Sequence, residues 1–264
     1  MNLRGCLTML VLGVLFLAAD IAERTVIIAI IKLRPSSRSA VLNGWLIGLC
    51  SLAFWVIRLI GGARFDFCEP IRCEPGILVV MNHQSLLDIP IALRCMTGGY
   101  PKIIARDRYR TSIPLISHMI RLYDHPTVKP GQRNSKEMQK LQGFAKTTVH
   151  PVVIYPEGSR SRDGDIKPFR TAGLKAILAA RAWNVYVIVI DGLWKSTSLG
   201  GFVRNVSSMR VTVKREGPLE FDSDRDDPNV FVDDLEHRMR RMLDRIRGRS
   251  TNPECHPGVQ EKAS

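Results

Sequence analysis

The sequence of 264 residues has few cysteines, no low-complexity tract and no internal repeat. Its six cysteines form no CxxC pair and show no zinc-type spacing, which argues against a disulfide framework and a zinc site. We therefore expect reduced thiols in a cytoplasmic setting. Hydrophobic residues make up 45% of the chain, which is enough for a packed core and excludes a wholly disordered protein.

Acidic residues are the second scarce class. The chain has 25 Asp and Glu against 38 Lys and Arg, a net charge of +13. This excess favours an anionic partner: nucleic acid, a phospholipid surface, or a phosphorylated or acidic molecule. The basic residues flank apolar segments instead of interleaving with aromatic ones, and no nucleic-acid-binding module is recognisable. We therefore predict no nucleic-acid partner.

The N-terminal quarter contains two apolar stretches, at residues 7–31 and 41–57. Three charged residues interrupt the first stretch: Asp20, Glu23 and Arg24. A spanning helix needs roughly 20 apolar residues, so these lengths fit either two spanning helices or a helical hairpin that dips into one leaflet. A signal peptide over residues 1–19 and a pair of soluble core helices are the alternatives. We predict a membrane-associated helical segment over residues 1–64.

The remainder alternates between strand-like and helix-like patterns. Short apolar runs predict strands over residues 76–81, 102–105, 150–155, 185–190 and 209–213, the last at a sheet edge. Apolar periodicity predicts helices over residues 85–96, 171–181 and 232–246. This order predicts an α/β fold, with a central, mostly parallel or mixed sheet flanked by helices and preceded by the apolar helical hairpin.

Two boundaries complete the predicted organisation. The α/β domain extends over residues 65–250, and residues 251–264 are expected to form a disordered tail. The last helix carries an arginine-rich face opposite its apolar face. It therefore either packs on the core with that basic face in solvent or lies on a membrane surface.

The first chemical motif is Asn82-His83-Gln84-Ser85-Leu86-Leu87-Asp88, at the junction of a predicted strand and helix. Residues five apart do not share one face of a regular helix. His83 must therefore lie in the loop before the helix, with Ser85 as the helix cap and Asp88 in the first turn. In that arrangement Asp88 orients the imidazole and His83 is free to accept a proton.

The second motif is Tyr155-Pro156-Glu157-Gly158-Ser159-Arg160-Ser161, directly after a predicted strand. The Pro and Gly predict a turn whose backbone amides can face an anion, and Arg160 adds a guanidinium group. A solvated turn with a structural glutamate is the alternative for this stretch taken alone.

The two motifs in this order resemble those of the glycerolipid acyltransferases, in particular bacterial 1-acylglycerol-3-phosphate acyltransferases. The resemblance covers roughly residues 70–220 and includes Ala105-Arg106, the segment 113–116 and Lys167-Pro168-Phe169-Arg170. An N-terminal apolar hairpin is also typical of that family. Three positions depart from its pattern, namely Ser117 for Gly, Lys129 for Arg and Tyr186 for Pro.

The resemblance implies direct transfer of an acyl group from a thioester to a lysophosphatidate hydroxyl. It implies His83 as general base and Asp88 as its orienting partner, with no acyl-enzyme, metal or other cofactor. Asn82 or nearby backbone amides are its candidate oxyanion donors. The implied substrate-binding residues are Arg106, Lys129, Glu157, Gly158, Ser159 and Arg160.

The implied partners are a phospholipid membrane, a lysophospholipid acceptor and acyl-coenzyme A or acyl carrier protein as co-substrate. The implied location is a membrane with the active site facing the cytoplasm, the inner membrane in a bacterium. Another lysolipid acceptor, such as a lyso-aminolipid, is the nearest alternative. A non-catalytic membrane-surface protein is a further one, for which His83 and Asp88 would be dispensable.

Overall fold

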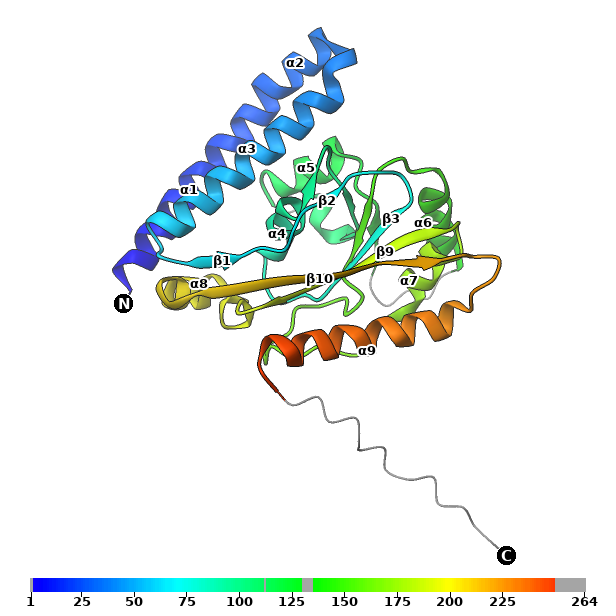
Figure 1. The fold of residues 1–264 in the computed structure, drawn as a ribbon. Coiled ribbons are helices and arrows are strands. Elements are labelled where there is room, and N and C mark those ends of the chain that lie inside the picture. The colour runs from blue at the N-terminus through cyan, green and yellow to red at the C-terminus, as the bar shows by residue number, and fades with distance from the viewer. Residues whose placement is uncertain (1, 112, 130–134, 250–264) are drawn as a thin grey trace, which may run out of the picture.

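The computed structural model describes residues 2–111, 113–129 and 135–249. The tail expected over residues 251–264 lies outside these described residues. Two helical rods at the N-terminus lean away from an α/β domain whose sheet has helices on both faces (Figure 1). The predicted fold class, a mixed sheet flanked by helices and preceded by an apolar hairpin, is confirmed.

The two rods form the apolar hairpin. The first runs without a break from α1 (Leu3–Ala22) through a π-helical turn (Glu23–Ile27) into α2 (Ile28–Leu33). The second is α3 (Arg38–Leu59), which follows a 3-10 turn (Pro35–Ser37). By length and composition, both are apolar enough to cross a membrane.

Asp20, Glu23 and Arg24 do not end the helix of the first rod, because each of the three has a partner. The Arg24 guanidinium bonds the Asp20 carboxylate, one helical turn earlier, at 2.9 Å. Glu23 is buried; one of its oxygens accepts a hydrogen bond from Trp45 Nε1 at 2.9 Å and the other lies 2.6 Å from His118 Nδ1. The three charges that interrupt the apolar stretch in the sequence are thus accommodated within one continuous helical rod.

The main sheet has six strands in the order β1-β10-β9-β3-β8-β5. Their bounds are β1 Arg64–Asp66, β3 Ile77–Met81, β5 Lys102–Ile103, β8 Val152–Ile154, β9 Trp183–Asp191 and β10 Arg210–Phe221. Strands β5, β8, β3 and β9 run parallel to one another, whereas β10 is antiparallel to β9. The carboxyl ends of β3, β8 and β9 therefore meet at one edge, and the turns that follow them lie together there.

Strand β10 differs from its prediction. The sequence predicts an edge strand over residues 209–213, but β10 has 12 residues and lies second from the edge, beside β1. Its middle carries Lys214, Arg215 and Glu216, so the apolar pattern ends long before the strand does.

Two small sheets and the helices α4 to α9 complete the domain over the described residues. Strand β2 (Ile71–Arg72) pairs with β4 (Met96–Thr97), and β6 (Ala105–Arg106) pairs with β7 (Thr127–Val128). The helices are α4 Asp88–Arg94, α5 Ile116–Leu122, α6 Ser135–Thr147, α7 Thr171–Leu178, α8 Leu199–Asn205 and α9 Pro228–Ile246. Short 3-10 turns cover Asp107–Arg110, Trp194–Ser196 and Val206–Ser208. The strand predicted over 102–105 is thus two strands in separate sheets.

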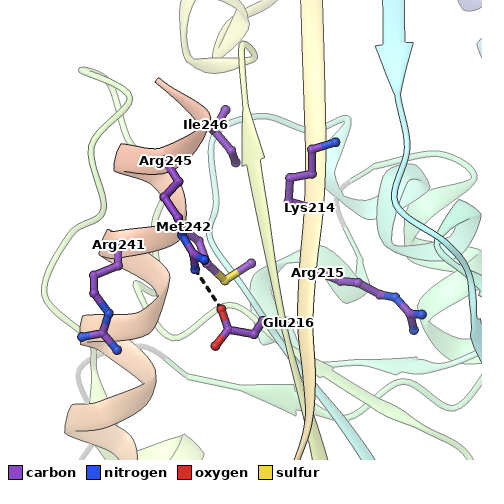
Figure 2. A pocket seen from close by; sticks show the side chains of 7 residues that line it. All are labelled: Lys214, Arg215, Glu216, Arg241, Met242, Arg245 and Ile246. Carbon is purple, nitrogen blue, oxygen red and sulfur yellow. Dashed lines mark hydrogen bonds and ion pairs between the residues drawn. The ribbon is translucent and has the colours of Figure 1, made fainter. Parts of the chain in front are cut away.

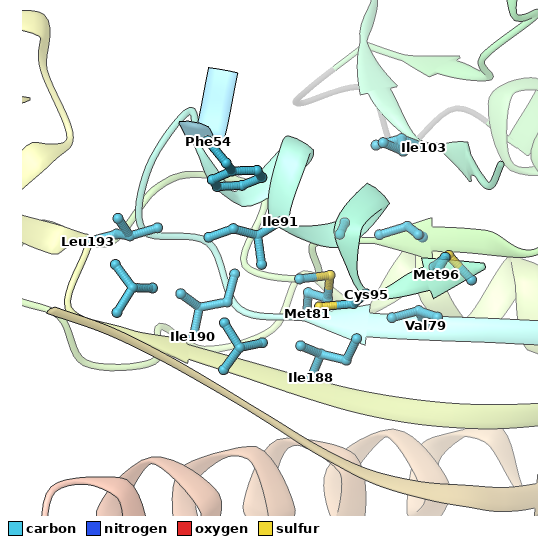
Figure 3. Close-up of a cluster of buried hydrophobic side chains, with 14 of the residues drawn as sticks. Phe54, Val79, Met81, Ile91, Cys95, Met96, Ile103, Ile188, Ile190 and Leu193 are labelled. Carbon is cyan, nitrogen blue, oxygen red and sulfur yellow. The ribbon is translucent and has the colours of Figure 1, made fainter. Parts of the chain in front are cut away.

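The core lies on both faces of the sheet. Alternate residues of β3 point to opposite faces, so Val79 and Met81 pack with Ile91 of α4 on one face (Figure 3). Leu78 and Val80 belong to the cluster on the other face, beneath α7 and α9. Helix α9 contributes to this cluster Val232, Leu235, Met239, Met242 and Leu243. The apolar face of α9 therefore packs on the core, as the first of the two interpretations predicts.

Candidate active site

His83 and Asp88 lie in the turn that joins β3 to α4. Asp88 is the first residue of α4 and is completely buried, whereas the His83 side chain is 20% exposed. His83 Nδ1 lies 2.7 Å from Asp88 Oδ2. The spacing argument, with the histidine in the loop and the aspartate in the first turn, is therefore confirmed.

The surroundings of Asp88 determine the imidazole tautomer. The same Oδ2 atom accepts hydrogen bonds from the backbone N–H groups of Gln84 at 2.6 Å and Ser85 at 2.8 Å. An oxygen that accepts two N–H bonds is held as a carboxylate oxygen, so the third contact requires a proton on His83 Nδ1. In the neutral imidazole, Nε2 is then the nitrogen that can accept a proton.

Ser85 does not cap α4, contrary to the sequence prediction. The residue before the helix is Leu87, and it makes no side-chain capping bond. Ser85 is 2% exposed, and its hydroxyl donates to the carbonyl oxygen of Ser196 at 3.1 Å. The Asp88 carboxylate accepts the N–H groups of Gln84 and Ser85, while the Ser85 hydroxyl makes a long 3.4 Å contact with the Leu87 N–H and joins the turn to the 3-10 turn at 194–196.

Asn82 likewise has a structural place. Its side chain is 1% exposed, donates to the Ile190 carbonyl at 2.8 Å and accepts from the Ile190 N–H at 2.7 Å. These bonds continue the pairing of β3 with β9 beyond the last backbone bond. The Asn82 side chain therefore bonds the backbone of the sheet, and this structural role accounts for its burial.

Tyr155 covers the imidazole from the end of β8. Its ring centroid lies 4.7 Å from that of His83, with an interplanar angle of 34°. Burial raises the pKa of the Tyr155 phenol well above its ordinary value, so the hydroxyl stays protonated. Among the described residues neither this hydroxyl nor Asp88 Oδ1 has a hydrogen-bond partner.

Glu157 connects the second motif to the first. Its carboxylate is 2% exposed; Oε1 accepts from the backbone N–H of His83 at 2.7 Å and Oε2 from that of Lys167 at 3.0 Å. Burial raises the pKa of the Glu157 carboxyl above its ordinary value, and the two backbone bonds partly oppose this shift. Glu157 thus holds the histidine turn and its own loop together.

Gly158 allows an arginine to lie directly against the loop. It has φ = +63°, and a Cβ atom there would lie 2.8 Å from Arg170 Cδ, so a side chain would be both strained and crowded. Its carbonyl oxygen accepts a hydrogen bond from the Arg106 guanidinium. The structure therefore brings Arg106 and the second motif together, as the sequence interpretation requires.

The remaining candidate residues surround the same loop. Ser159 accepts a hydrogen bond from Lys167 Nζ at 3.2 Å, and the Arg160 guanidinium donates to the Thr197 carbonyl. Lys129 is exposed and directly follows Val128, the residue that pairs with Arg106 in the β6–β7 sheet. Three basic side chains thus lie at the second motif, namely Arg106, Arg160 and Lys167, and Lys129 follows the strand that pairs with Arg106.

The region that contains both motifs is similar to known proteins. Residues 63–191 match the acyltransferase family model. Residues 63–191 are an acyltransferase-family region. This region contains both motifs, so the resemblance found in the sequence is confirmed.

Two curated relatives carry more specific names. The human 1-acyl-sn-glycerol-3-phosphate acyltransferase beta is 26% identical over 147 residues, which cover 52% of this chain and 51% of that protein. A 1-acyl-sn-glycerol-3-phosphate acyltransferase of Cocos nucifera is 24% identical over 151 residues, covering 55% of this chain and 46% of that protein. The matched region therefore spans about half the length of these curated relatives.

The fold has a solved counterpart. The crystal structure of the 1-acyl-sn-glycerophosphate (LPA) acyltransferase PlsC from Thermotoga maritima matches with a TM-score of 0.68 and 17% identity. The match covers 94% of this chain and 100% of that chain, so the hairpin and the α/β domain share one architecture with it.

Sequence reasoning missed one buried network behind the acyltransferase motifs. Gln84, Asp191 and Arg247 are joined by side-chain hydrogen bonds, with Asp191 at the end of β9 and Arg247 directly after α9. In the sequence Arg247 is only one of several arginines on the polar face of the last helix. No local pattern distinguishes it, because its partners are 56 and 82 residues away.

A cavity of about 790 Å³ lies between β10 and the end of α9, and His83 is not among its lining residues (Figure 2). Its basic lining is largely neutralised by carboxylates, since Arg245 bonds Glu216, Lys214 bonds Asp66, and Arg215 bonds Glu69 outside the cavity. Among the described residues, no group of three or more His, Cys, Asp or Glu side chains is placed to hold a metal ion.

Proposed function

We propose that this acyltransferase transfers a fatty acyl group from a thioester donor to the free hydroxyl of lysophosphatidate, forming phosphatidate at a membrane. The observation that carries the proposal is the His83–Asp88 pair, bonded at 2.7 Å, beside a loop that Arg106 and Lys167 contact. The names of the curated relatives and of the matching structure support the same reaction.

The proposed reaction uses His83 as a general base. Its Nε2 removes the proton of the acceptor hydroxyl while that oxygen attacks the thioester carbonyl carbon. The Asp88 carboxylate stabilises the resulting imidazolium through Nδ1. The tetrahedral intermediate then breaks its carbon–sulfur bond, and the proton on Nε2 passes to the departing thiolate. An ester and a free thiol are formed, and the enzyme returns to its starting state.

The acceptor phosphate is proposed to bind to the basic side chains around the second motif. Arg106, Lys129 and Arg160 supply positive charge there, and guanidinium groups form paired hydrogen bonds with phosphate oxygens. Ser159 and the backbone of Gly158 line the same turn. Glu157 contributes by holding this turn against His83 and not by contact with the phosphate.

The activity test compares the wild-type protein in detergent with His83→Ala. The acceptors are lysophosphatidate and the phosphate-free monoacylglycerol, each with acyl-coenzyme A or acyl carrier protein as donor. We expect product from lysophosphatidate only, and a loss of at least about 100-fold on substitution, the usual contribution of a general base. His237→Ala is the matched control, because His237 is exposed on α9.

Two results would change the proposal. Turnover close to wild type in His83→Ala would remove the base role. If monoacylglycerol or another lysolipid gave product and lysophosphatidate gave none, the protein would still be an acyltransferase, but the proposed acceptor would be wrong.

Membrane association is proposed from the apolar surface of the hairpin. The hairpin exposes most of the large hydrophobic side chains at the surface, among them Leu10 at 65%, Val14 at 61% and Leu17 at 58%. Such a continuous apolar surface is unfavourable in water and favours insertion into lipid. The geometry fits either spanning helices or a hairpin within one leaflet, and we propose that the active site faces the cytoplasm.

Vesicle flotation tests this association. The variant Leu10→Ser/Val14→Ser/Leu17→Ser should float several-fold less than wild type with vesicles that contain anionic phospholipid. The control variant Val149→Ser/Leu199→Ser/Val230→Ser removes three comparably exposed apolar side chains from the α/β domain. Equal losses in both variants would argue against a specific role of the hairpin.

A further inference from the structure

Arg247 fastens the end of the last helix to the turn that follows β9. Its side chain is only 13% exposed and makes a forked contact with Asp191, with Nε to Oδ2 at 2.9 Å and Nη2 to Oδ1 at 2.8 Å. Burial acts to raise the pKa of Asp191, but hydrogen bonds from Arg247 and Gln84 outweigh it and hold that pKa below its ordinary value. The pair is therefore ionised and geometrically fixed.

The same guanidinium holds the loop of the second motif. Nη1 bonds Asp165 at 2.6 Å, and Nη2 donates to the Gly164 carbonyl at 2.9 Å. Gly164 has φ = +89°, and a Cβ atom there would lie 2.7 Å from both Arg247 Nη2 and Trp194 Cδ1. A glycine at this position is what lets the arginine reach the loop backbone.

Gln84 joins this arrangement to the catalytic pair. It is fully buried, and its side-chain amide donates to the two acceptors that Arg247 also uses, Gly164 O at 3.1 Å and Asp191 Oδ1 at 3.3 Å. Its backbone N–H donates to Asp88 Oδ2, the atom that also faces His83. One residue thus connects the Arg247 contacts to the carboxylate that orients the base.

The loop has a second attachment to the histidine. The backbone N–H of Ser161 donates to the His83 carbonyl at 2.7 Å, and the Ser161 hydroxyl accepts from the Gly164 N–H at 3.0 Å. The Gly164 turn that Arg247 holds is therefore bonded, through Ser161, to the backbone of the base itself.

We propose that Arg247 is a positioning residue for acyl transfer: it fixes Gln84 and the loop at residues 157–167, and through them the orientation of the His83–Asp88 pair. This inference rests on the proposed function. Arg247 contacts the loop at Gly164 and Asp165 and not at the proposed phosphate-binding side chains, so its loss should impair the chemical step more than acceptor binding. Small displacements of a catalytic group are costly, about 100-fold in rate for 1 Å.

The kinetic test uses Arg247→Ala and Arg247→Lys. We expect kcat to fall by about 10- to 100-fold in Arg247→Ala, with KM for lysophosphatidate changed less than about threefold. Lysine keeps the charge, but its single ammonium group cannot bond both oxygens of Asp191 and also the loop at Gly164 and Asp165. Arg247→Lys should therefore retain only part of kcat. The control is Arg245→Ala, which removes a more exposed arginine near the end of α9 that pairs with Glu216.

Two further measurements separate positioning from general stability. Guanidinium ion at low millimolar concentration should restore part of kcat to Arg247→Ala but none to His83→Ala. In a double-mutant cycle, Asp191→Asn should add little to the loss already caused by Arg247→Ala, because the two residues act as one unit. A kcat in Arg247→Ala close to that of wild type, or a loss equal to that of Arg245→Ala, would overturn the proposal.

Amide hydrogen exchange tests the positioning role of Arg247 without measuring activity, so it is independent of the proposed function. Exchange at Ser161 and Gly164 should rise in Arg247→Ala and stay at the wild-type level in Arg245→Ala. A wild-type protein inactive with every donor and acceptor would refute the proposed function. Unchanged exchange in Arg247→Ala would independently refute the positioning role.

Discussion

The backbone N–H of His83 donates a hydrogen bond of 2.7 Å to the carboxylate of Glu157, 74 residues further along the chain. The other oxygen of this carboxylate accepts from Lys167, so Glu157 is used completely by backbone donors. The two sequence motifs are therefore one unit, in which the glutamate fixes the position of the base. This explains why a buried carboxylate stands beside basic residues without pairing with any of their side chains.

Glu157→Gln should reduce both stability and turnover. An amide offers one acceptor oxygen, so its NH2 group would face one of the two backbone donors and leave it unpaired. An unsatisfied buried donor costs about 1–3 kcal/mol, and we expect a loss of that size in the free energy of unfolding, measured with urea. Turnover should fall by at least about tenfold, since the His83 turn loses a fixed contact.

Glu69→Gln provides the control for this substitution. Glu69 is a largely exposed acid that pairs with Arg215, and such surface pairs contribute little. Its stability and turnover should stay close to wild type. A stable and fully active Glu157→Gln protein would show that the link between the motifs is dispensable.

Asp88→Asn tests the orientation of the imidazole. The asparagine can keep one oxygen toward the N–H groups of Gln84 and Ser85, but His83 then faces an uncharged partner that stabilises its imidazolium poorly. A comparable substitution in a serine protease costs about 10⁴-fold in kcat, and we expect a loss of about 10³- to 10⁴-fold here. Unfolding in urea should confirm that the variant is folded, and a loss below about tenfold would argue against Asp88 as orienting partner.

Ser85→Ala should affect stability and spare catalysis. The hydroxyl is buried and bonds the Ser196 carbonyl, so its removal should cost about 1 kcal/mol in unfolding free energy. Because the proposed reaction forms no acyl-enzyme on serine, turnover should stay close to wild type. Loss of turnover equal to that of His83→Ala, together with a covalent acyl adduct in the wild-type protein by mass spectrometry, would reverse this assignment.

The predictable parts of the fold are those with a strong local pattern. Strand β3 and residues 187–190 of β9 are buried on both faces, so they appear in the sequence as unbroken apolar runs. Strand β10 is half polar, and its true length depends on pairing with β9, which a local pattern does not encode. The continuity of the first helical rod through its charges likewise depends on tertiary contacts, because Glu23 is satisfied by Trp45 and His118 from distant parts of the chain.

The candidate site shows the same division. The pairing of His83 with Asp88 follows from their spacing and from the strand–helix junction, so the sequence alone predicts it. The contacts of Glu157 and Arg247 join segments that meet only in the folded protein. For Ser85 the local preference for capping loses to a tertiary acceptor, because its hydroxyl donates to the Ser196 carbonyl while Asp88 accepts the N–H groups of Gln84 and Ser85.

His125 should make the protein less stable as the pH falls. Burial, with the nearby charge of Lys102 and of His150, lowers the pKa of His125 to about 3. Its Nδ1 accepts a hydrogen bond from the Ile103 N–H at 3.1 Å, which requires an unprotonated nitrogen. The unfolded chain protonates near its ordinary value of about 6.5, so stability is complete above that pH and is lost as the pH falls toward 3.

The comparison of wild type with His125→Asn isolates this contribution. Asparagine can keep an acceptor for the Ile103 N–H but does not titrate. Between about pH 7 and pH 5 the wild-type protein should lose about 2 kcal/mol more unfolding free energy than the variant, since the slope approaches about 1.4 kcal/mol per pH unit. His237→Asn, at an exposed site on α9, should follow the wild-type curve. Parallel curves for wild type and His125→Asn would mean that His125 protonates in the folded protein as readily as in the unfolded chain.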